Sequence, residues 1–339
     1  MRGSRGSEEP TAATRTTRRE ALRAIALAAS AGFASLAPAQ GTRQRARIAY
    51  LSLAPGPSSR SEALAAGLRD LGYVDGQNVD IEYRWAGEDL ERLRQGAADL
   101  VRSGVDVIVT GGPQATRAAK EATARIPIVM AFDYDPVSTG FVKTLARPGG
   151  NVTGLSGFDL QLCGKRLELL RDINPAATRI ALLRNSREPN ADVFLRETQS
   201  AAQAMGLQVR AVEIHVRADL DRVLRAAATA GMQALVVLTD PVTLYNRTEV
   251  ASLAALYRLP AIYSERAFSE AGGLMSYGAS DRALHRRAAV YVDKILKGAQ
   301  PAVLPVEQPT TFDLVINESA AKALGLTIPQ ALSLRAEII

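Results

Sequence analysis

Acidic and aromatic side chains recur where the sequence predicts that buried strands end. Asp133, Asp135 and Asp240 each follow an apolar run, and Tyr134 and Tyr277 lie nearby. Carboxylates in such places could act as general bases, or they could accept charge-assisted hydrogen bonds from the ammonium group of a ligand. Asp135 and Asp240 both precede proline, so capping of the following helix or turn explains these two residues equally well.

Small and hydroxylated residues follow two other predicted strands. Residues 111–116 contain two glycines, a proline and a threonine at a predicted helix N-terminus, where backbone N–H groups attract a carboxylate. Ser58 and Ser59 offer hydroxyl groups in a similar position. These segments suit the anionic group of a ligand.

Together the two patterns favour a small zwitterionic ligand, with an amino acid of aromatic or branched type as its leading member. Glu188 is a further acceptor for an ammonium group. Phe132, Tyr134 and Tyr277 could form aromatic walls, although packing explains each of them equally well. The predicted ligand-binding residues are Ser58, Ser59, Gly112, Gln114, Ala115, Tyr134, Asp135, Asn185, Asp240 and Tyr277.

The motifs of common catalytic sites are incomplete. Residues 154–158 begin like the nucleophile elbow of serine hydrolases, but Phe158 stands where the second spaced glycine belongs. No lysine follows the turn at residues 111–113 at the spacing of a phosphate loop. Residues 53–57, after the first strand, lack the dinucleotide fingerprint. The sequence therefore predicts no catalytic residue.

Metal and thiol chemistry have little support. Cys163 is the one cysteine of the sequence, so it forms no internal disulfide, and the acid/base pair of two-cysteine racemases is missing. We expect Cys163 to be a small buried side chain. His215 and His285 lie in unrelated contexts, so no structural zinc site is expected. The sequence predicts no metal and no cofactor.

Short apolar runs and helical patterns alternate along the chain. In a first unit they predict strands at residues 47–51, 78–85, 105–109 and 126–132, and helices at 61–71, at 90–102 and from the turn at 111–113 to Thr123. The same order starts again after residue 154, with strands at 180–183, 208–214, 234–238 and 260–263, and helices at 161–171, 191–205, 220–228 and 248–257. This alternation favours parallel sheets that are covered by helices on both faces.

Ligands of such sheets bind beyond the carboxyl ends of the strands. If the two units face each other, loops such as residues 185–190, 239–243 and 264–266 line a cleft between them. A cleft of this kind is a common place for a small ligand.

The first 39 residues have the pattern of an export signal. The pair Arg18-Arg19 precedes an apolar run over residues 24–36 and the small-residue site Ala37-Pro38-Ala39. The run is about a dozen residues long, whereas a membrane-spanning helix needs roughly 20. We expect cleavage after residue 39 and export by the twin-arginine route. No cysteine follows this site to carry a lipid anchor.

Residues 40–339 are enough for two ordinary domains. Cleavage removes six arginines and three glutamates, which lowers the formal net charge from +6. No Lys/Arg cluster with interleaved aromatics follows, and this argues against nucleic-acid binding. With 47 % apolar residues and no later run that approaches a membrane span, a globular periplasmic protein is expected.

Six segments in a fixed order carry a family resemblance. They are residues 71–79 (LGYVDGQNV), 126–129 (IPIV), 145–154 (LARPGGNVTG), 272–278 (GGLMSYG), 293–298 (DKILKG) and 304–309 (LPVEQP). In these segments the chain resembles the periplasmic substrate-binding proteins of ABC transporters, in the family that includes tryptophan- and tyrosine-type binders. The resemblance extends from about residue 47 to residue 338.

The resemblance implies a type I periplasmic binding-protein fold. Two doubly wound parallel-sheet lobes, joined by hinge strands, would close on a small ligand and deliver it to a permease that works with an ATPase. The chain would cross between the lobes near residues 154–158, 276–279 and 305–311, and the protein is expected to be a monomer. The predicted lobes are residues 46–156 with 279–308 for lobe 1, and residues 157–278 with 309–339 for lobe 2.

Two other functions remain open at this point. A ligand-sensing periplasmic protein would report to a membrane receptor instead of a permease. An enzyme would convert its ligand and would lose turnover when Asp135 or Asp240 is changed to alanine. The resemblance favours transport, although a fold by itself does not fix a function.

Overall fold

The computed structural model describes residues 45–157, 159–188 and 190–339. The predicted export signal at residues 1–39 lies outside the described residues, and so does Phe158. Within the described ranges, no helix combines the length and the apolar character that a membrane crossing requires. The strands between Arg45 and Ile339 form two separate sheets.

The first sheet is parallel throughout. Its strands are β1 (Ala46–Ser52), β2 (Val79–Trp85), β3 (Val107–Thr110), β4 (Ile128–Met130) and β5 (Val152–Gly154), in the order β2-β1-β3-β4-β5. All residues of the central strand β3 are buried, as expected for a parallel sheet with helices on both faces. The edge strand β2 is only partly buried, in agreement with its alternating sequence.

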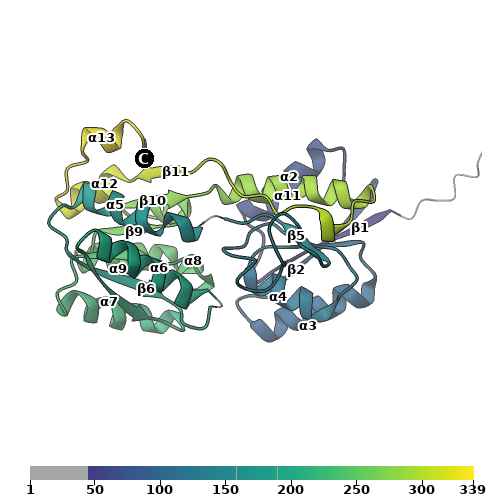
Figure 1. Cartoon of the computed structure of the whole chain (residues 1–339), viewed down its shortest axis with the longest axis horizontal. Helices are drawn as coiled ribbons and strands as arrows, with labels where there is room; N and C mark the ends of the chain where they lie inside the picture. Colours follow the sequence, from purple (N-terminus) through teal and green to yellow (C-terminus); the bar gives the residue numbers. More distant parts are fainter. Residues whose placement is uncertain (1–44, 158, 189) are drawn as a thin grey trace, which may run out of the picture. The chain divides into compact units, whose positions relative to one another are not determined.

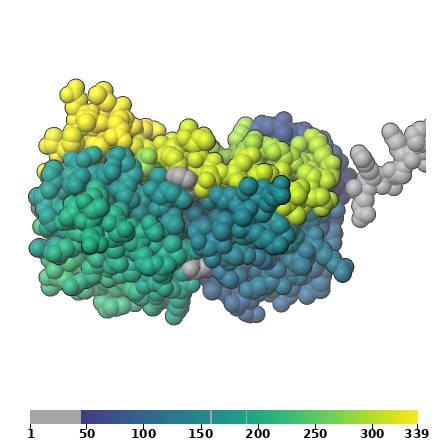
Figure 2. All heavy atoms as spheres, viewed as in Figure 1, coloured from purple at the N-terminus to yellow at the C-terminus, as the bar shows by residue number. Residues whose placement is uncertain are grey.

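Helices cover both faces of this sheet. One face carries α2 (Ser59–Asp70) and α11 (Asp281–Leu296), and the other carries α3 (Leu90–Ser103) and α4 (Pro113–Ala122). Although α11 comes from the C-terminal part of the chain, it packs against α2, as the colours in Figures 1 and 2 show. A Cβ atom at Gly67 of α2 would lie 2.5 Å from the carbonyl oxygen of Arg286, so the two helix backbones are in close contact. We call this sheet with its four helices the first lobe.

The second sheet is larger and mixed. Its strands are β6 (Arg179–Arg184), β7 (Gln208–Glu213), β8 (Ala234–Val237), β9 (Ala261–Tyr263), β10 (Met275–Gly278), β11 (Asp313–Ile316) and β12 (Glu337–Ile338), in the order β12-β11-β10-β9-β8-β6-β7. The pair β10 and β11 is antiparallel, whereas the other neighbours are parallel. The C-terminal segment thus extends this sheet at one edge.

Helices also cover both faces of the second sheet. One core contains residues of α5 (Cys163–Ile173), α6 (Ala191–Ala204), α12 (Glu318–Leu324) and α13 (Gln330–Ser333), and the other contains residues of α7 (Leu220–Thr229), α8 (Pro241–Tyr245), α9 (Arg247–Leu256) and α10 (Arg266–Glu270). Short 3₁₀ helices are η1 (Asp159–Leu162), η2 (Arg217–Asp219) and η3 (Pro301–Val303). We call the second sheet with its helices, η1 and η2 the second lobe.

The chain passes between the lobes after β5, after β10 and before β11. The segment after β5 runs beside the segment that leads to β11. The Ser156 N–H donates to the Glu307 carbonyl (2.9 Å), and the Glu307 N–H donates to the Gly154 carbonyl (3.0 Å). Arg287 of α11 holds the Glu307 carboxylate with two hydrogen bonds of 2.8 and 2.9 Å. The connecting segments are therefore tied to each other and to the first lobe.

The predicted fold class is confirmed, since two α/β lobes with mostly parallel sheets are present. The differences lie at the ends of elements and in the shortest elements. The strand predicted over residues 126–132 is shortened to β4, whose last residue, Met130, pairs with Gly154 at the end of β5. The short elements α8, α10 and β12 are not predicted, because so few residues cannot display a period.

Gly154 should be intolerant of a side chain. Its φ is 132°, and a Cβ atom would lie 2.2 Å from the Met130 carbonyl oxygen. We expect Gly154→Ala to lower the free energy of unfolding by roughly 2–4 kcal/mol, because backbone strain and overpacking add. Urea denaturation followed by circular dichroism measures this change.

Gly150→Ala is the matched control. No atom lies within 4 Å of a Cβ atom at this position. The substitution should change the free energy of unfolding by no more than about 0.5 kcal/mol. Equal stabilities of the two variants would contradict the assignment of strain to Gly154.

Candidate functional site

Two adjoining pockets lie between the lobes, where several parallel strands end. They share walls formed by Pro113, Tyr134, Glu188, Thr239 and Asp240. The first two residues follow β3 and β4 of the first lobe, and the other three follow β6 and β8 of the second lobe. This is the end of a doubly wound sheet at which ligands bind. We name the two spaces the Phe194 pocket and the Arg60 pocket, each after a residue that lines only that one.

The start of α4 forms the first-lobe wall of the Arg60 pocket. Gly112 is the N-cap of α4, and Pro113 follows in the first turn, where a missing N–H costs no intrahelical hydrogen bond. Gln114 and Ala115 also line this pocket. The Gln114 Nε2 donates to the carboxylate of Glu188, which belongs to the second lobe. The first turn of α4 therefore borders the pocket and contacts the opposite lobe.

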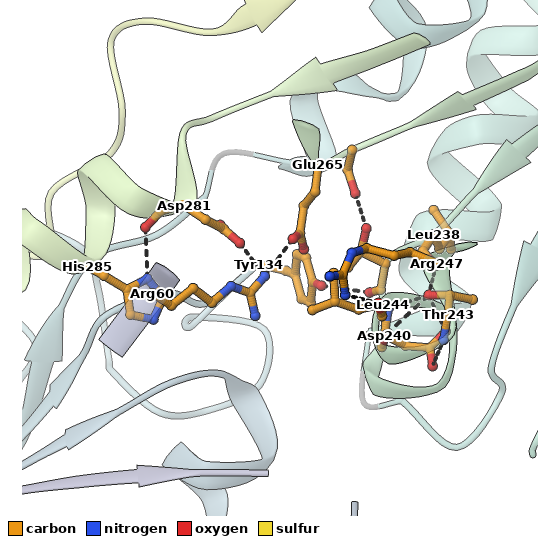
Figure 3. A network of polar contacts seen from close by, with 12 residues as sticks. Arg60, Tyr134, Leu238, Asp240, Thr243, Leu244, Arg247, Glu265, Asp281 and His285 are labelled. Carbon is orange, nitrogen blue, oxygen red and sulfur yellow. Dashed lines mark hydrogen bonds and ion pairs between the residues drawn. The ribbon is translucent and has the colours of Figure 1, made fainter. Parts of the chain in front are cut away.

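Tyr134 provides an aromatic wall that both pockets share. Its ring meets Phe132 edge-on at 4.7 Å and Phe194 of α6 edge-on at 5.6 Å, measured between ring centroids. The Tyr134 hydroxyl donates to the Thr239 carbonyl of the second lobe at 2.6 Å (Figure 3). Leu238 adds further apolar surface to the Phe194 pocket. This pocket suits an apolar or aromatic group.

Glu188 and Asp240 place two carboxyl groups in the shared part of the pockets. Burial and, to a smaller extent, the charge of Asp240 raise the pKa of Glu188 to about 8, and the hydrogen bond from Gln114 opposes this change. Burial also raises the pKa of Asp240 to about 6. Among the described residues, no Lys or Arg side chain forms an ion pair with either group. Arg166 and Arg184 line the Phe194 pocket and Arg60 lines the Arg60 pocket, but the ion pairs of Arg60 and Arg184 are with other carboxylates.

Asp240 also stabilises the start of a helix. It is the N-cap of α8, and its Oδ1 accepts hydrogen bonds from the Val242 N–H (2.7 Å) and the Thr243 N–H (3.3 Å). The Asn185 side chain also bonds to this carboxyl group. Asp240 therefore caps α8, as one of the two interpretations of the sequence predicts. The same residue also borders both pockets.

Six of the predicted ligand-binding residues meet at the two pockets, and four do not. Those that line the pockets are Gly112, Gln114, Ala115, Tyr134, Asn185 and Asp240. Ser58 and Ser59 border neither pocket but an adjoining cavity beside the start of α2, which shares Arg60, Tyr245 and Glu265 with the Arg60 pocket. Ser58 forms the cap of that helix, since its N–H donates to the Ser61 Oγ at 3.0 Å.

Asp135 and Tyr277 lie away from both pockets. The Asp135 Oδ1 accepts a hydrogen bond from the Ser138 N–H (3.1 Å), so its carboxyl group stabilises a turn. Tyr277 lies in β10, where its ring contacts Phe312 at a centroid distance of 6.1 Å. Local hydrogen bonding and sheet packing thus account for these two residues.

Sequence reasoning missed Arg60, Arg166, Arg184, Phe194 and Glu265 as pocket residues. Glu265 lies in the predicted strand-end loop at residues 264–266, and Arg60 directly follows Ser58 and Ser59 after the first predicted strand, so the positions of both were indicated although their roles were not. Phe194 lies inside α6. An aromatic residue within a helix gives no sign in the sequence that it faces a second lobe.

Asp240→Ala should destabilise the empty protein. Loss of the cap on α8 is expected to cost about 1–2 kcal/mol, so the midpoint of thermal unfolding should fall. Asp240→Asn keeps one oxygen acceptor and should retain most of that stability. Differential scanning calorimetry without ligand compares the two variants. An unchanged midpoint in Asp240→Ala would contradict a role in capping.

The raised pKa of Glu188 should make stability depend on pH. The folded protein binds a proton here more tightly than the unfolded chain does. The resulting stability is fully present below about pH 4.5 and is lost as the pH rises through about 8. Between pH 5 and 8 the free energy of unfolding should fall less in Glu188→Gln than in the unchanged protein.

Glu197→Gln, on the exposed side of α6, serves as the control for this measurement. Urea denaturation at several pH values gives the slopes. Equal slopes in Glu188→Gln and in the unchanged protein would contradict the burial of an ionisable group at this site.

Comparison with known proteins finds relatives among substrate-binding proteins. A tyrosine-binding protein of Clostridioides difficile (strain R20291) is 28 % identical over 279 residues, which cover 82 % of this chain and 80 % of that protein. An ABC domain from Streptococcus pneumonia in complex with L-Trp has a TM-score of 0.81 at 28 % identity, covering 87 % of this chain and 100 % of that one. A ligand-free, open substrate-binding protein with adhesive properties from Clostridium difficile has a TM-score of 0.66 at 27 % identity, covering 87 % and 99 %.

The family described as ABC transporter substrate binding protein matches residues 51–339, which is nearly all of the part that the structure describes. That family consists of solute-binding proteins and is not a class of enzymes. With two α/β lobes and pockets between them, the chain belongs to the ABC transporter substrate-binding proteins.

Proposed function

We propose that this protein is the periplasmic solute-binding component of an ABC importer and that it captures an amino-acid-like ligand between its lobes. The observation that carries the proposal is the pair of buried carboxyl groups, Glu188 and Asp240, beside the aromatic rings of Tyr134 and Phe194. The proposal includes export by the twin-arginine route, action as a monomer, and direct delivery of the ligand to a permease that works with an ATPase.

An ammonium group of the ligand would satisfy both carboxyl groups. A carboxylate that is removed from water without a cation is costly, which is why the pKa of Glu188 and that of Asp240 are raised. An incoming ammonium group brings one positive charge and three hydrogen-bond donors. It would favour the ionised carboxyl groups and would form charge-assisted hydrogen bonds with them.

The remaining walls suit the rest of an aromatic amino acid. The first turn of α4, a helix of ten residues, offers backbone N–H groups to a carboxylate at the Gly112 end. Tyr134, Phe194 and Leu238 offer apolar surface to a ring. The ligand would thus touch both lobes at once, and a ligand that does so favours their closure.

The relatives support this choice of ligand class. One is described as tyrosine-binding, and another was solved in complex with L-Trp. At nearly equal identity, the TM-score is higher for the L-Trp complex (0.81) than for the ligand-free, open structure (0.66). Over the whole chain, this structure is therefore more similar to the liganded relative.

A thermal-shift screen tests the proposal. The protein is first unfolded and refolded to remove any carried ligand, and it is then heated with L-tryptophan, L-tyrosine, branched amino acids, sugars or organic acids. A ligand at a hundredfold excess over its dissociation constant stabilises the folded state by about 2.7 kcal/mol. A shift with aromatic amino acids is expected. A shift with a sugar alone would overturn the proposed ligand class.

The role of Glu188 is tested by pairing a variant with a ligand analogue. Glu188→Gln should weaken the binding of L-tryptophan roughly 10- to 100-fold, because one charge-assisted hydrogen bond to the ammonium group is lost. Indole-3-propionate lacks this group, so its affinity should change little. Isothermal titration calorimetry measures both ligands, with Glu197→Gln as the control. Equal losses for the two ligands would contradict the assignment.

A further inference from the structure

A second group of charged side chains connects the lobes at the far side of the Arg60 pocket. The Arg60 guanidinium lies 2.6 Å from the Glu265 Oε2 and also contacts the Asp281 carboxylate. Figure 3 shows Arg60 extending between the two acids. Arg60 and Asp281 belong to α2 and α11 of the first lobe, whereas Glu265 follows β9 in the second lobe. We call these three residues the Arg60 cluster.

The Arg60 cluster is shielded from water. The side chains of Arg60, Glu265 and Asp281 are only 18 %, 10 % and 14 % exposed. Ion pairs on an open surface contribute little, but charges in a dry site interact strongly and must be balanced. The balance of charge within this cluster therefore matters for the contact between the lobes.

Two carboxyl groups share one guanidinium group in the cluster. The Glu265 Oε1, the oxygen that does not contact Arg60, is buried without a hydrogen-bond partner among the described residues. A buried carboxylate oxygen without a donor or a second cation is costly, and a proton removes the charge. With two carboxylates and one guanidinium group, the cluster has a net charge of −1 unless one of the acids binds a proton.

The neighbouring titratable groups do not supply the missing positive charge. His285 of α11 is fully buried, and burial lowers its pKa to about 4, so it is neutral. Its Nδ1 is 2.8 Å from the Asp281 carbonyl oxygen. Tyr50 of β1 and Tyr245 of α8 also face the cluster, and burial raises the pKa of both, so they are neutral too.

The charged groups around the adjacent cavity are engaged elsewhere or exposed. Arg266 binds Glu337 and Glu270, and Arg247 donates to the Leu244 carbonyl. Arg282 and Asp313 are exposed. Water and salt screen charges in such positions. The Arg60 cluster is left to balance its own charge.

We propose that the Arg60 cluster is a latch between the lobes that holds one proton on the Glu265–Asp281 pair when the lobes are in contact and releases it when they separate. Opening would move Glu265 away from Arg60 and Asp281 and into water. The carboxyl group would then ionise in the ordinary range. The latch requires only that the lobes separate and close, as the proposed function supposes, and it does not depend on the identity of the ligand.

The sign of the pH effect follows from the closed state. Burial raises the pKa of Glu265 well above its ordinary value of 4.5, and the charge of Asp281 acts in the same direction, against Arg60. The contribution to closure is therefore fully present below pH 4.5 and is lost as the pH rises through the raised pKa. One proton changes the closing equilibrium by at most about tenfold per pH unit.

The distance between the lobes in the empty protein is the first readout. Spin labels at Glu121→Cys on α4 and Gln203→Cys on α6 occupy exposed positions in different lobes, and the natural Cys163 is buried. Pulsed electron–electron double resonance at pH 5.5, 7.0 and 8.5 gives the distance distribution. We expect the population that prevails at pH 5.5 to decline as the pH rises.

The variant Glu265→Gln separates the pH dependence that the latch causes from that of other groups that titrate in the same range, such as Glu188. The amide keeps an acceptor for Arg60 and cannot ionise, so it imitates the protonated acid at every pH. At pH 8.5 this variant should retain more of the pH 5.5 population than the unchanged protein does. Asp281→Asn, which also removes the shared proton, should weaken the pH dependence in the same way.

Glu270→Gln is the matched control, because Glu270 is exposed and pairs with Arg266 on the nearby α10. Its distance distributions should follow those of the unchanged protein at each pH. Equal pH shifts in Glu265→Gln and in the unchanged protein would overturn the latch, and so would the absence of any shift in the unchanged protein.

Binding of L-tryptophan gives a second readout. The dissociation constant of the unchanged protein divided by that of Glu265→Gln should rise with pH, by up to about tenfold per unit. A ratio that stays constant between pH 5.5 and 8.5 would overturn the latch. Failure to bind L-tryptophan or any other amino acid would instead count against the proposed function, while the distance measurement still decides the latch.

Discussion

Several carboxyl groups between the lobes have no cation of their own, and other contacts there compensate for this lack. Glu188 and Asp240 have hydrogen-bond donors but form no ion pair within the described residues, and Glu265 shares Arg60 with a second acid. A carboxylate out of water needs a cation or a proton. A positively charged ligand can neutralise a buried carboxylate. A proton taken up from the solvent can do the same.

Rigid lobes are needed to present these groups from opposite sides. Each sheet has helices on both faces, and the close contact of α2 with α11 at Gly67 fixes the helix that carries Asp281. Segments that connect the lobes are hydrogen-bonded to one another at Ser156 and Glu307. The lobes can therefore keep their internal structure while the contacts between them form and break.

The architecture could be predicted because it depends on local patterns. Apolar runs and helical periods identify strands such as β3 and helices such as α3, and their alternation leads to parallel sheets. The candidate site could be predicted only where it follows the same rule, at strand ends such as Gly112 and Asp240. Phe194 obeys no such rule, because its position relative to the pockets depends on how the lobes meet.

By itself, the sequence determined the order of elements, the two-lobed α/β class and the strand ends from which polar groups project, because each of these follows from residues close together in the chain. Only the tertiary structure decided which of those groups meet. Arg60 and Glu265 are 205 positions apart, and Asp281 reaches them after the chain has returned to the first lobe. The pairing of charges between lobes depends on this return, since Coulomb energies are set by distance in space and by exclusion of water.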